Sequence, residues 1–364
     1  MKYIAPIVMI IFIIMIISCS SNRDAGSLNI VDEVSYNVGF RSANICHSEY
    51  NGKEYVAFAD FITYKTIAVF DILGSHINKI DMTDLITKMG RPITYTMISN
   101  DTIILLMDKT NIVYIIDKNG NIIGVKDYSV LEPYGVELSP PIYINNNNFR
   151  TSIFYDEDFH EGYTKDMISS FRAKEHCFYR LMVDTTFYGK ESPLLQMDST
   201  YNRFVANDGC IQEGNHILMM ENQNILYSAY SDSLYIFSIN GYLVQIKKIK
   251  SDYGRPMFVP STYNELRKDP AVSTRQFKNN VSICDLLWDK YRNIYYCFVR
   301  RKMEKNSMPF SIIVLDCHFN RLNEFDMGGE NYYATSFVGE RGLYIMKKNQ
   351  NLDRLYFTIF NYEK

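Results

Sequence analysis

The sequence lacks several features that mark common protein classes. Its 364 residues contain one Trp against 29 Tyr and 22 Phe, and the formal net charge is only -3. Nucleic-acid binding needs a concentrated positive field, so this charge balance argues against it. Hydrophobic residues make up 47% of the chain, which is too many for a disordered protein. Because Tyr and Phe favour strands, we expect a globular protein rich in β-structure.

Catalytic motifs are also missing. The six His show no i,i+4 pairing and no His-Glu-x-x-His motif, and the chain has no Gly-x-Ser-x-Gly elbow and no Gly-rich phosphate loop. No Cys-x-x-Cys spacing occurs, so a structural zinc site is not expected. Nucleophilic or zinc hydrolase chemistry therefore has no motif support, while a site built from isolated residues stays open.

The longest apolar run lies at the N-terminus. After Lys2, residues 3–17 are almost entirely apolar. A run of about 15 residues is shorter than the ~20 that span a bilayer and is typical of a signal peptide. Residues 16–19, Ile-Ile-Ser-Cys, resemble a bacterial lipobox, which implies acylation of Cys19 and removal of residues 1–18. The alternatives are an ordinary secretory signal or an uncleaved anchor, with the cysteine incidental.

This N-terminus predicts the domain organisation and the location. We expect a lipoprotein signal peptide over residues 1–18, an acylated tether over 19–34 and a single domain over 35–364. The polar residues that follow Cys19 are typical of a flexible tether. The expected location is the bacterial cell envelope, with the lipid in the outer membrane and the protein on its periplasmic or surface face.

Six further cysteines remain. An exported protein meets an oxidising environment, in which disulfides are allowed. Six cysteines can pair in many ways, and the sequence does not choose among them. A cysteine inside an apolar strand segment is more often a small buried residue. The six are Cys46, Cys177, Cys210, Cys284, Cys297 and Cys317.

A hairpin unit recurs along the chain. In each copy an apolar run ends in Asp or a similar polar residue, a short turn follows, and a second strand begins. The Asp is expected to accept bonds from nearby backbone N–H groups, and Asn-Gly to supply positive φ at both turn centres. Six copies enter their turns at residues 71, 117, 184, 238, 316 and 361.

The spacing of these turns predicts the architecture. The shorter steps match the ~40–50 residues of a four-stranded propeller blade. A single such sheet exposes an apolar face, and radial packing buries it. We therefore expect an all-β fold, a six-bladed β-propeller of four-stranded antiparallel blades. The alternative is a β-sandwich or two smaller β domains.

Closure of the ring also has a candidate. The last strand, residues 355–362, has no later segment to pair with it at the outer edge of the last blade. Residues 35–40, which precede the first complete unit, are predicted to supply that strand.

The lipobox and the hairpin unit together resemble the six-bladed, TolB-like β-propeller lipoproteins of Bacteroides-type bacteria. Residues 288–300 look like the signature segment of an uncharacterised, domain-of-unknown-function lipoprotein family in that group, and residues 311–316 and 342–345 continue the match. The resemblance implies fold and location and no activity. Cys297 departs from the pattern, since a basic residue is common there, and this weakens any ligand contact at that position.

The tripeptide Gly-Arg-Pro occurs twice and supplies the first two candidate ligand contacts. Arg91 and Arg255 each stand between Gly and Pro in a connection before a new blade. Proline forces the preceding Arg into an extended conformation, and the forked donors of Arg capture carboxylates or sulfates. The alternative is an Arg that satisfies loop carbonyls.

The segment that contains the sole Trp supplies two more candidate ligand contacts, Trp288 and Arg292. Trp288 could stack on a sugar ring, although a Trp at a strand entrance more often packs between blades. Arg292 follows in the same turn and is the fourth candidate, although Asp289 with Arg292 is also expected to brace the turn. No catalytic and no metal-ligating residue is assigned.

Residues 156–161 gather four carboxylates and one imidazole. Oxygen-rich clusters can bind Ca²⁺, but this run lacks the spacing of a calcium-binding loop. A solvated acidic loop is the favoured interpretation. No cofactor is expected, with Ca²⁺ as a weak alternative.

These features favour a non-enzymatic binding or scaffold module for a protein, peptide or glycan, held at the membrane by the lipid on Cys19 and without a nucleic-acid partner. The alternative is a propeller-type hydrolase or lyase with a central divalent cation, acting on a glycan or lactone-like substrate. It requires carboxylates and Asn side chains from several blades to meet at the channel mouth. A structural envelope component without a small ligand is a third hypothesis. The sequence assigns no oligomeric state.

Overall fold

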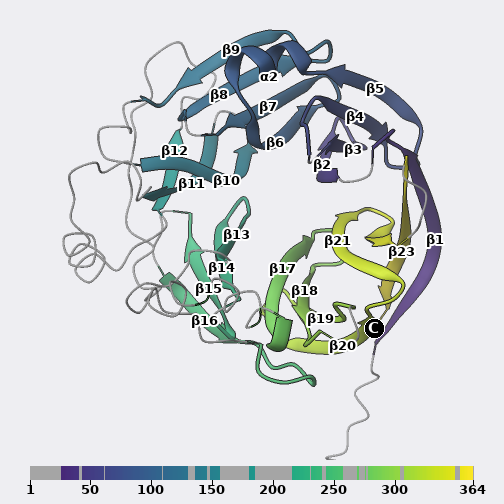
Figure 1. Cartoon of the computed structure of the whole chain (residues 1–364). Coiled ribbons are helices and arrows are strands. Elements are labelled where there is room, and N and C mark those ends of the chain that lie inside the picture. The colour runs from purple at the N-terminus through teal and green to yellow at the C-terminus, as the bar shows by residue number, and fades with distance from the viewer. Residues whose placement is uncertain are drawn as a thin grey trace, which may run out of the picture.

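The protein folds into a ring of antiparallel β-sheets arranged around a central axis (Figure 1). The structure is a computed structural model. It describes residues 26–40, 43–60, 62–108, 110–129, 136–145, 148–155, 180–184, 215–229, 231–239, 243–256, 269, 275, 278–303, 307–348 and 353–363.

Within these residues, five sheets have four strands each. The first three consist of β2 (Ala43–Tyr50), β3 (Lys53–Asp60), β4 (Thr66–Asp71) and β5 (His76–Asp81); of β6 (Pro92–Ser99), β7 (Thr102–Met107), β8 (Ile112–Asp117) and β9 (Ile122–Asp127); and of β13 (Asn215–Met219), β14 (Gln223–Ser228), β15 (Ser233–Ser238) and β16 (Leu243–Lys248).

The other two four-stranded sheets come from the last third of the chain, except for β1, which comes from its N-terminal end. They consist of β17 (Ser282–Asp289), β18 (Ile294–Arg300), β19 (Phe310–Asp316) and β20 (Arg321–Gly328); and of β21 (Tyr332–Gly339), β22 (Gly342–Lys347), β23 (Arg354–Glu363) and β1 (Ser27–Asn37). A three-stranded sheet consists of β10 (Val136–Asn145), β11 (Asn148–Tyr155) and β12 (Arg180–Asp184). One short helix, α2 (Thr83–Met89), lies between β5 and β6.

The all-β propeller of four-stranded antiparallel blades is confirmed, but the predicted number of blades is wrong. The described residues form five four-stranded blades, and the sixth sheet, β10–β12, has three strands. The prediction failed because it used turn spacing alone and therefore assumed that the hairpin at residue 184 belongs to a complete blade. The residues after β12, up to 214, lie outside the described part of the chain.

The inner strands close the ring. Around the axis, β2 contacts β6, β6 contacts β10, β10 contacts β13, β13 contacts β17, β17 contacts β21, and β21 contacts β2. Six clusters of buried apolar side chains lie between neighbouring sheets. Each sheet thus buries both faces, as a radial arrangement requires.

The position of a strand within its blade decides its burial. The second strand β18, with sequence IYYCFVR, is buried at every position. The fourth strand β16, with sequence LVQIKK, is almost fully exposed. Middle strands have a neighbouring sheet on each face, so they read as continuous apolar runs and not as an alternation of apolar and polar residues.

The predicted closure strand is confirmed and is longer than expected. β1 pairs antiparallel with β23 from Ser27 opposite Glu363 to Asn37 opposite Arg354. The outer strand of the last blade therefore comes from the N-terminal end of the chain. It begins at Ser27, whereas we expected the tether to extend to residue 34.

The hairpin turns use the predicted Asp residues. Oδ1 of Asp117 accepts the backbone N–H groups of Asn119 at 2.8 Å and of Asn121 at 2.9 Å, and Asp71 and Asp316 make the same pair of bonds in their own turns. Within the Asp117 turn, positive φ occurs at only one residue, Gly120, and the register shifts beside it. The turn is therefore an Asp-x-x-Gly turn with a bulge, and not the two-residue Asn-Gly turn that we expected.

Replacing Gly120 by Ala is expected to lower the free energy of unfolding by about 2–3 kcal/mol. Its φ of 82° strains any side chain, and a Cβ would lie 2.8 Å from the carbonyl oxygen of Asp81 on the preceding blade. Urea unfolding measures the change. Gly52, with φ of 69° and no atom near its Cβ position, is the matched control, for which the same substitution should cost about 1 kcal/mol. Equal costs at both sites would contradict the blade contact.

The ring has two different ends. Because neighbouring strands are antiparallel, the turns from first to second strand and from third to fourth strand lie at one end of every blade, which we call the turn end. The links from second to third strand and from one blade to the next lie at the other end, the connection end. No helix within the described residues is long and apolar enough to span a membrane.

Candidate functional site

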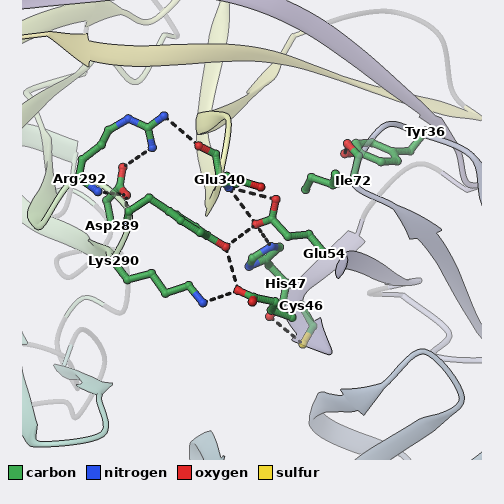
Figure 2. Close-up of polar contacts among 11 residues, drawn as sticks. Tyr36, Cys46, His47, Glu54, Ile72, Asp289, Lys290, Arg292 and Glu340 are labelled. Atoms are coloured by element: carbon green, nitrogen blue, oxygen red, sulfur yellow. Dashed lines mark hydrogen bonds and ion pairs between the residues drawn. The ribbon is translucent and has the colours of Figure 1, made fainter. Parts of the chain in front are cut away.

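A polar network joins three blades at the turn end. Glu54, at the start of β3, has a side chain that is only 7% exposed. Its Oε1 accepts Nε2–H of His47 at 3.0 Å and the backbone N–H of Glu340 at 2.9 Å, and the same N–H lies 3.0 Å from Oε2 (Figure 2). Glu340 lies in the β21–β22 turn, so this carboxylate ties the β2–β5 blade to the blade that carries the closure strand.

The surroundings of Glu54 decide its charge. Burial alone would raise the pKa of its carboxyl, but the bonds from His47, from the backbone of Glu340 and from Tyr291 outweigh burial and hold the pKa below its ordinary value. The group is therefore ionised at neutral pH, and each of its donors stabilises that charge.

Tyr291 extends the network to the β17–β20 blade. Its hydroxyl lies 2.9 Å from Oε1 of Glu54 and 3.0 Å from Oε2 of Glu49, which also pairs with Lys290. A phenol has one proton, so the two carboxylates share it. Burial and the bond to Glu54 raise the pKa of Tyr291 far above its usual range. We call His47, Glu49, Glu54, Lys290, Tyr291 and Glu340 the turn-end network.

Arg292, a predicted ligand contact, lies beside this network and contacts protein groups. Its Nη1 donates to Oδ2 of Asp289 at 3.1 Å, and its Nη2 donates to the carbonyl of Glu340 at 3.0 Å (Figure 2). Its Nε donates to Asn361. The predicted turn-bracing pair of Asp289 and Arg292 is confirmed. Only 20% of the Arg292 side chain is exposed, so its donors hold the last two blades together.

The structure places the two Gly-Arg-Pro arginines at the connection end, on opposite sides of the ring. Arg91 precedes β6, is exposed, and lies with its guanidinium carbon 4.8 Å from the ring centroid of Tyr64. Arg255 lies between β16 and β17, and three sheets separate it from Arg91 in either direction. The two therefore do not form one site.

Arg255 is the more prominent of the two. Its side chain is 62% exposed, while its Nε donates to Oδ2 of Asp232 at 2.7 Å. Tyr253, 38% exposed, lies two residues away. Arg301 lies 4.3 Å above the ring of Tyr253 and pairs with Asp326 at 2.9 Å. We call Asp232, Tyr253, Arg255, Arg301 and Asp326 the connection-end patch.

Trp288 packs against the protein. The indole lies 4.4 Å, centroid to centroid, from the ring of Tyr295 and adds to the core between the β13–β16 and β17–β20 blades. This is the between-blade packing that we weighed against sugar stacking.

A third polar group, which was not among the predicted candidates, lies on the inner strand β17. The hydroxyl of Tyr227, from the neighbouring blade, donates to Oδ1 of Asp285 at 3.1 Å, and the ring of His216 stacks on Tyr227 with centroids 5.3 Å apart. Burial raises the pKa of Asp285 to about 6, although the bonds from Leu286 N–H and Tyr227 act in the opposite direction. An isolated Asp in an apolar run is the only signal that could have indicated this site.

Replacing Asp285 by Asn should change how stability depends on pH. The folded-state pKa of about 6 lies above the unfolded value of about 4, so the wild type loses stability as pH rises between them. The variant has no such proton to lose. Its stability relative to wild type should rise by about 2 kcal/mol from pH 4 to pH 7.5, measured by urea unfolding. Tyr227→Phe removes a donor that lowers the pKa of Asp285, so the stability of this variant should fall more steeply with rising pH than that of the wild type. A difference that does not vary with pH would refute this account.

Several predictions fall partly or wholly outside the described residues. Cys19, the signal peptide and the acidic run at 156–161 lie outside them, as do Cys177 and Cys210. Cys46, Cys284, Cys297 and Cys317 carry free thiols. In the part of the chain that the structure describes, no group of three or more His, Cys, Asp and Glu side chains is placed to hold a metal ion.

Comparison with known families gives one match. Residues 185–326 match the family described as "Domain of unknown function (DUF4221)". No curated protein matches the sequence. The predicted resemblance to an uncharacterised family of Bacteroides-type bacteria is supported to this extent.

The solved structures that are similar along most of the chain include two from Bacteroides. A member of the DUF4221 family from Bacteroides vulgatus has a TM-score of 0.71 and 19% identity, and the match covers 94% of this chain and 100% of that one. A candidate exported protein from Bacteroides fragilis has a TM-score of 0.49 and 10% identity, with 94% and 97% covered. The first likeness shows a shared fold.

Proposed function

We propose that this protein is an envelope-anchored binding module whose propeller presents its connection end to a protein, peptide or glycan. The observation that carries the proposal is the position of Arg255. Its guanidinium is mostly exposed, yet one edge is held by the largely buried carboxylate of Asp232. An exposed cation that is already oriented loses less conformational entropy when it binds a ligand.

The neighbours of Arg255 suit the same role. Tyr253 presents a half-exposed ring that Arg301 supports from one side. Tyr and Arg are among the residue types that contribute most to binding at protein surfaces. A carboxylate or sulfate on the ligand would pair with Arg255, and an apolar or sugar face would pack on Tyr253.

The anchor is the second part of the proposal. Acylation of Cys19 after removal of residues 1–18 would hold the chain at the bacterial envelope, in the manner of the lipoproteins that the lipobox resembles. Several acyl chains on one cysteine make a stable anchor, whereas a single chain is marginal. Mass spectrometry of the mature N-terminus tests this. An acylated Cys19 is expected, and an unmodified cysteine or an intact leader would contradict the anchor.

The ligand site is tested by photo-crosslinking in cells. A benzophenone amino acid at position 253 should give a crosslinked product, which Arg255→Ala should reduce at least ten-fold. Because the Arg255 side chain is 62% exposed and Asp232 also accepts a bond from Ser233, that substitution should change the unfolding free energy by under about 1 kcal/mol. Lys302→Ala, which removes another exposed charge at the connection end, is the matched control and should leave the product unchanged. No product, or one insensitive to Arg255→Ala, would overturn the site.

A further inference from the structure

We propose that the turn end of the ring rests on the bilayer surface, with apolar side chains at three hairpin tips inserted into the lipid interface. This inference rests on the proposed function in one respect, because the anchor on Cys19 is what holds the chain at the membrane. It adds the orientation of the ring and a protein surface that contacts lipid.

The first observation is where the N-terminal segment leaves the ring. β1 begins at Ser27, paired with Glu363 at the turn end of the last blade. The carbonyl of Gly26 accepts a bond from Nδ2 of Asn323 at 2.7 Å. A Cβ on Gly26 would lie 2.4 Å from the hydroxyl of Tyr362, so the chain passes close against the last blade here. The exit point is therefore fixed on the folded ring.

The second observation is the length of the remaining tether. Gly26 is seven positions after Cys19, and a fully extended chain over seven positions spans at most about 25 Å. A lipid on Cys19 therefore keeps the exit point close to the bilayer. The short tether also keeps the nearby surface at a high effective concentration relative to lipid.

The third observation is the distribution of exposed apolar side chains at this end. Leu73 in the β4–β5 turn is 64% exposed, Ile123 just after the β8–β9 turn is 59% exposed, and Val244 just after the β15–β16 turn is 67% exposed. A single exposed apolar residue is normal on a protein surface. Here equivalent hairpins of three blades each carry at least one, and the strands that follow, β5, β9 and β16, lie along the outer rim (Figure 1).

Neighbouring positions extend these tips. Ile122 is 39% exposed beside Ile123, and Leu243 is 51% exposed beside Val244. Apolar side chains at turn tips can enter the boundary between headgroups and acyl chains to a depth of about 5–10 Å. With the turn end on the membrane, the connection-end patch faces away from it, toward a ligand in the aqueous phase.

Quenching by brominated lipids tests this orientation. The full acylated protein is reconstituted in phosphatidylethanolamine–phosphatidylglycerol vesicles that contain brominated acyl chains. In a Trp288→Phe background, Leu73→Trp places the only indole at the turn end. Ile62→Trp is the matched control, because Ile62 is 67% exposed on the same blade but at the connection end. Ile123→Trp provides a second turn-end position.

We expect the fluorescence of Leu73→Trp and Ile123→Trp to fall at least two-fold more than that of Ile62→Trp, with a blue shift only at the turn end. Equal quenching, or stronger quenching of Ile62→Trp, would overturn the orientation. If Trp288→Phe does not fold, the three substitutions are compared with Trp288 retained, since its signal is common to all of them.

The anchor and the orientation fail in different ways. The mass of the mature N-terminal peptide is measured on the same sample. A missing acyl group would refute the anchor in the proposed function. An acylated protein with an unquenched Leu73→Trp would refute the orientation alone.

Discussion

Replacing Glu54 by Ala is expected to lower the free energy of unfolding by about 3 kcal/mol. The substitution leaves the donors from His47, Tyr291 and the backbone of Glu340 without their acceptor in a site where the carboxylate is only 7% exposed. Each buried donor that loses its partner costs about 1–3 kcal/mol, and partial entry of water reduces the sum. Urea unfolding followed by circular dichroism measures the loss.

Glu49→Ala is the matched control for this prediction. Glu49 belongs to the same network and pairs with Lys290 and Tyr291, but 36% of its side chain is exposed. Its removal should therefore cost no more than about 1 kcal/mol. If the two substitutions had equal effects, the network would be a set of solvated surface pairs and would not join the blades.

Replacing Tyr36 by Ala is expected to cost about 4 kcal/mol. Tyr36 lies near the end of β1 and is fully buried. Its ring packs against Phe58, Phe70 and Phe357, with centroids 4.9, 5.4 and 5.7 Å away. Removing a buried aromatic side chain costs about 3–5 kcal/mol, since burial is lost and a cavity remains. Urea unfolding is again the measurement.

Tyr36→Phe separates the ring from the hydroxyl. The hydroxyl donates to the carbonyl of Ile72 at 3.0 Å, so its removal alone should cost about 1 kcal/mol. A loss below about 1.5 kcal/mol for Tyr36→Ala would mean that β1 is not packed between the first and last blades.

The sequence predicted the structure correctly where the structure depends on local patterns. Asp71, Asp117 and Asp316 mark hairpin turns because each carboxylate accepts N–H groups two and four residues later, which is visible in any short window. The closure strand could be inferred because the outer edge of the last predicted blade needed a partner strand.

Contacts between distant blades could not be predicted. Tyr291 and Glu54 are 237 residues apart in sequence and meet only because the ring brings the β17–β20 and β2–β5 blades to either side of the last one. Arg292 was predicted to contact a ligand because its protein partners, Asn361 and Glu340, are 69 and 48 residues away in sequence and could not be foreseen. The number of complete blades also depended on strands that turn spacing does not reveal.

Hydrogen exchange followed by mass spectrometry tests the central claim most directly, namely that the N-terminal strand is the outer strand of the last blade and fixes where the tether leaves the ring. β1 is an edge strand, so only its amides that point to β23 are hydrogen-bonded. The account predicts that about half of the amides of residues 27–37, those that donate to β23, exchange as slowly as amides of residues 354–363. Exchange of residues 27–37 at the rate of an unstructured segment, while residues 354–363 stay protected, would contradict it.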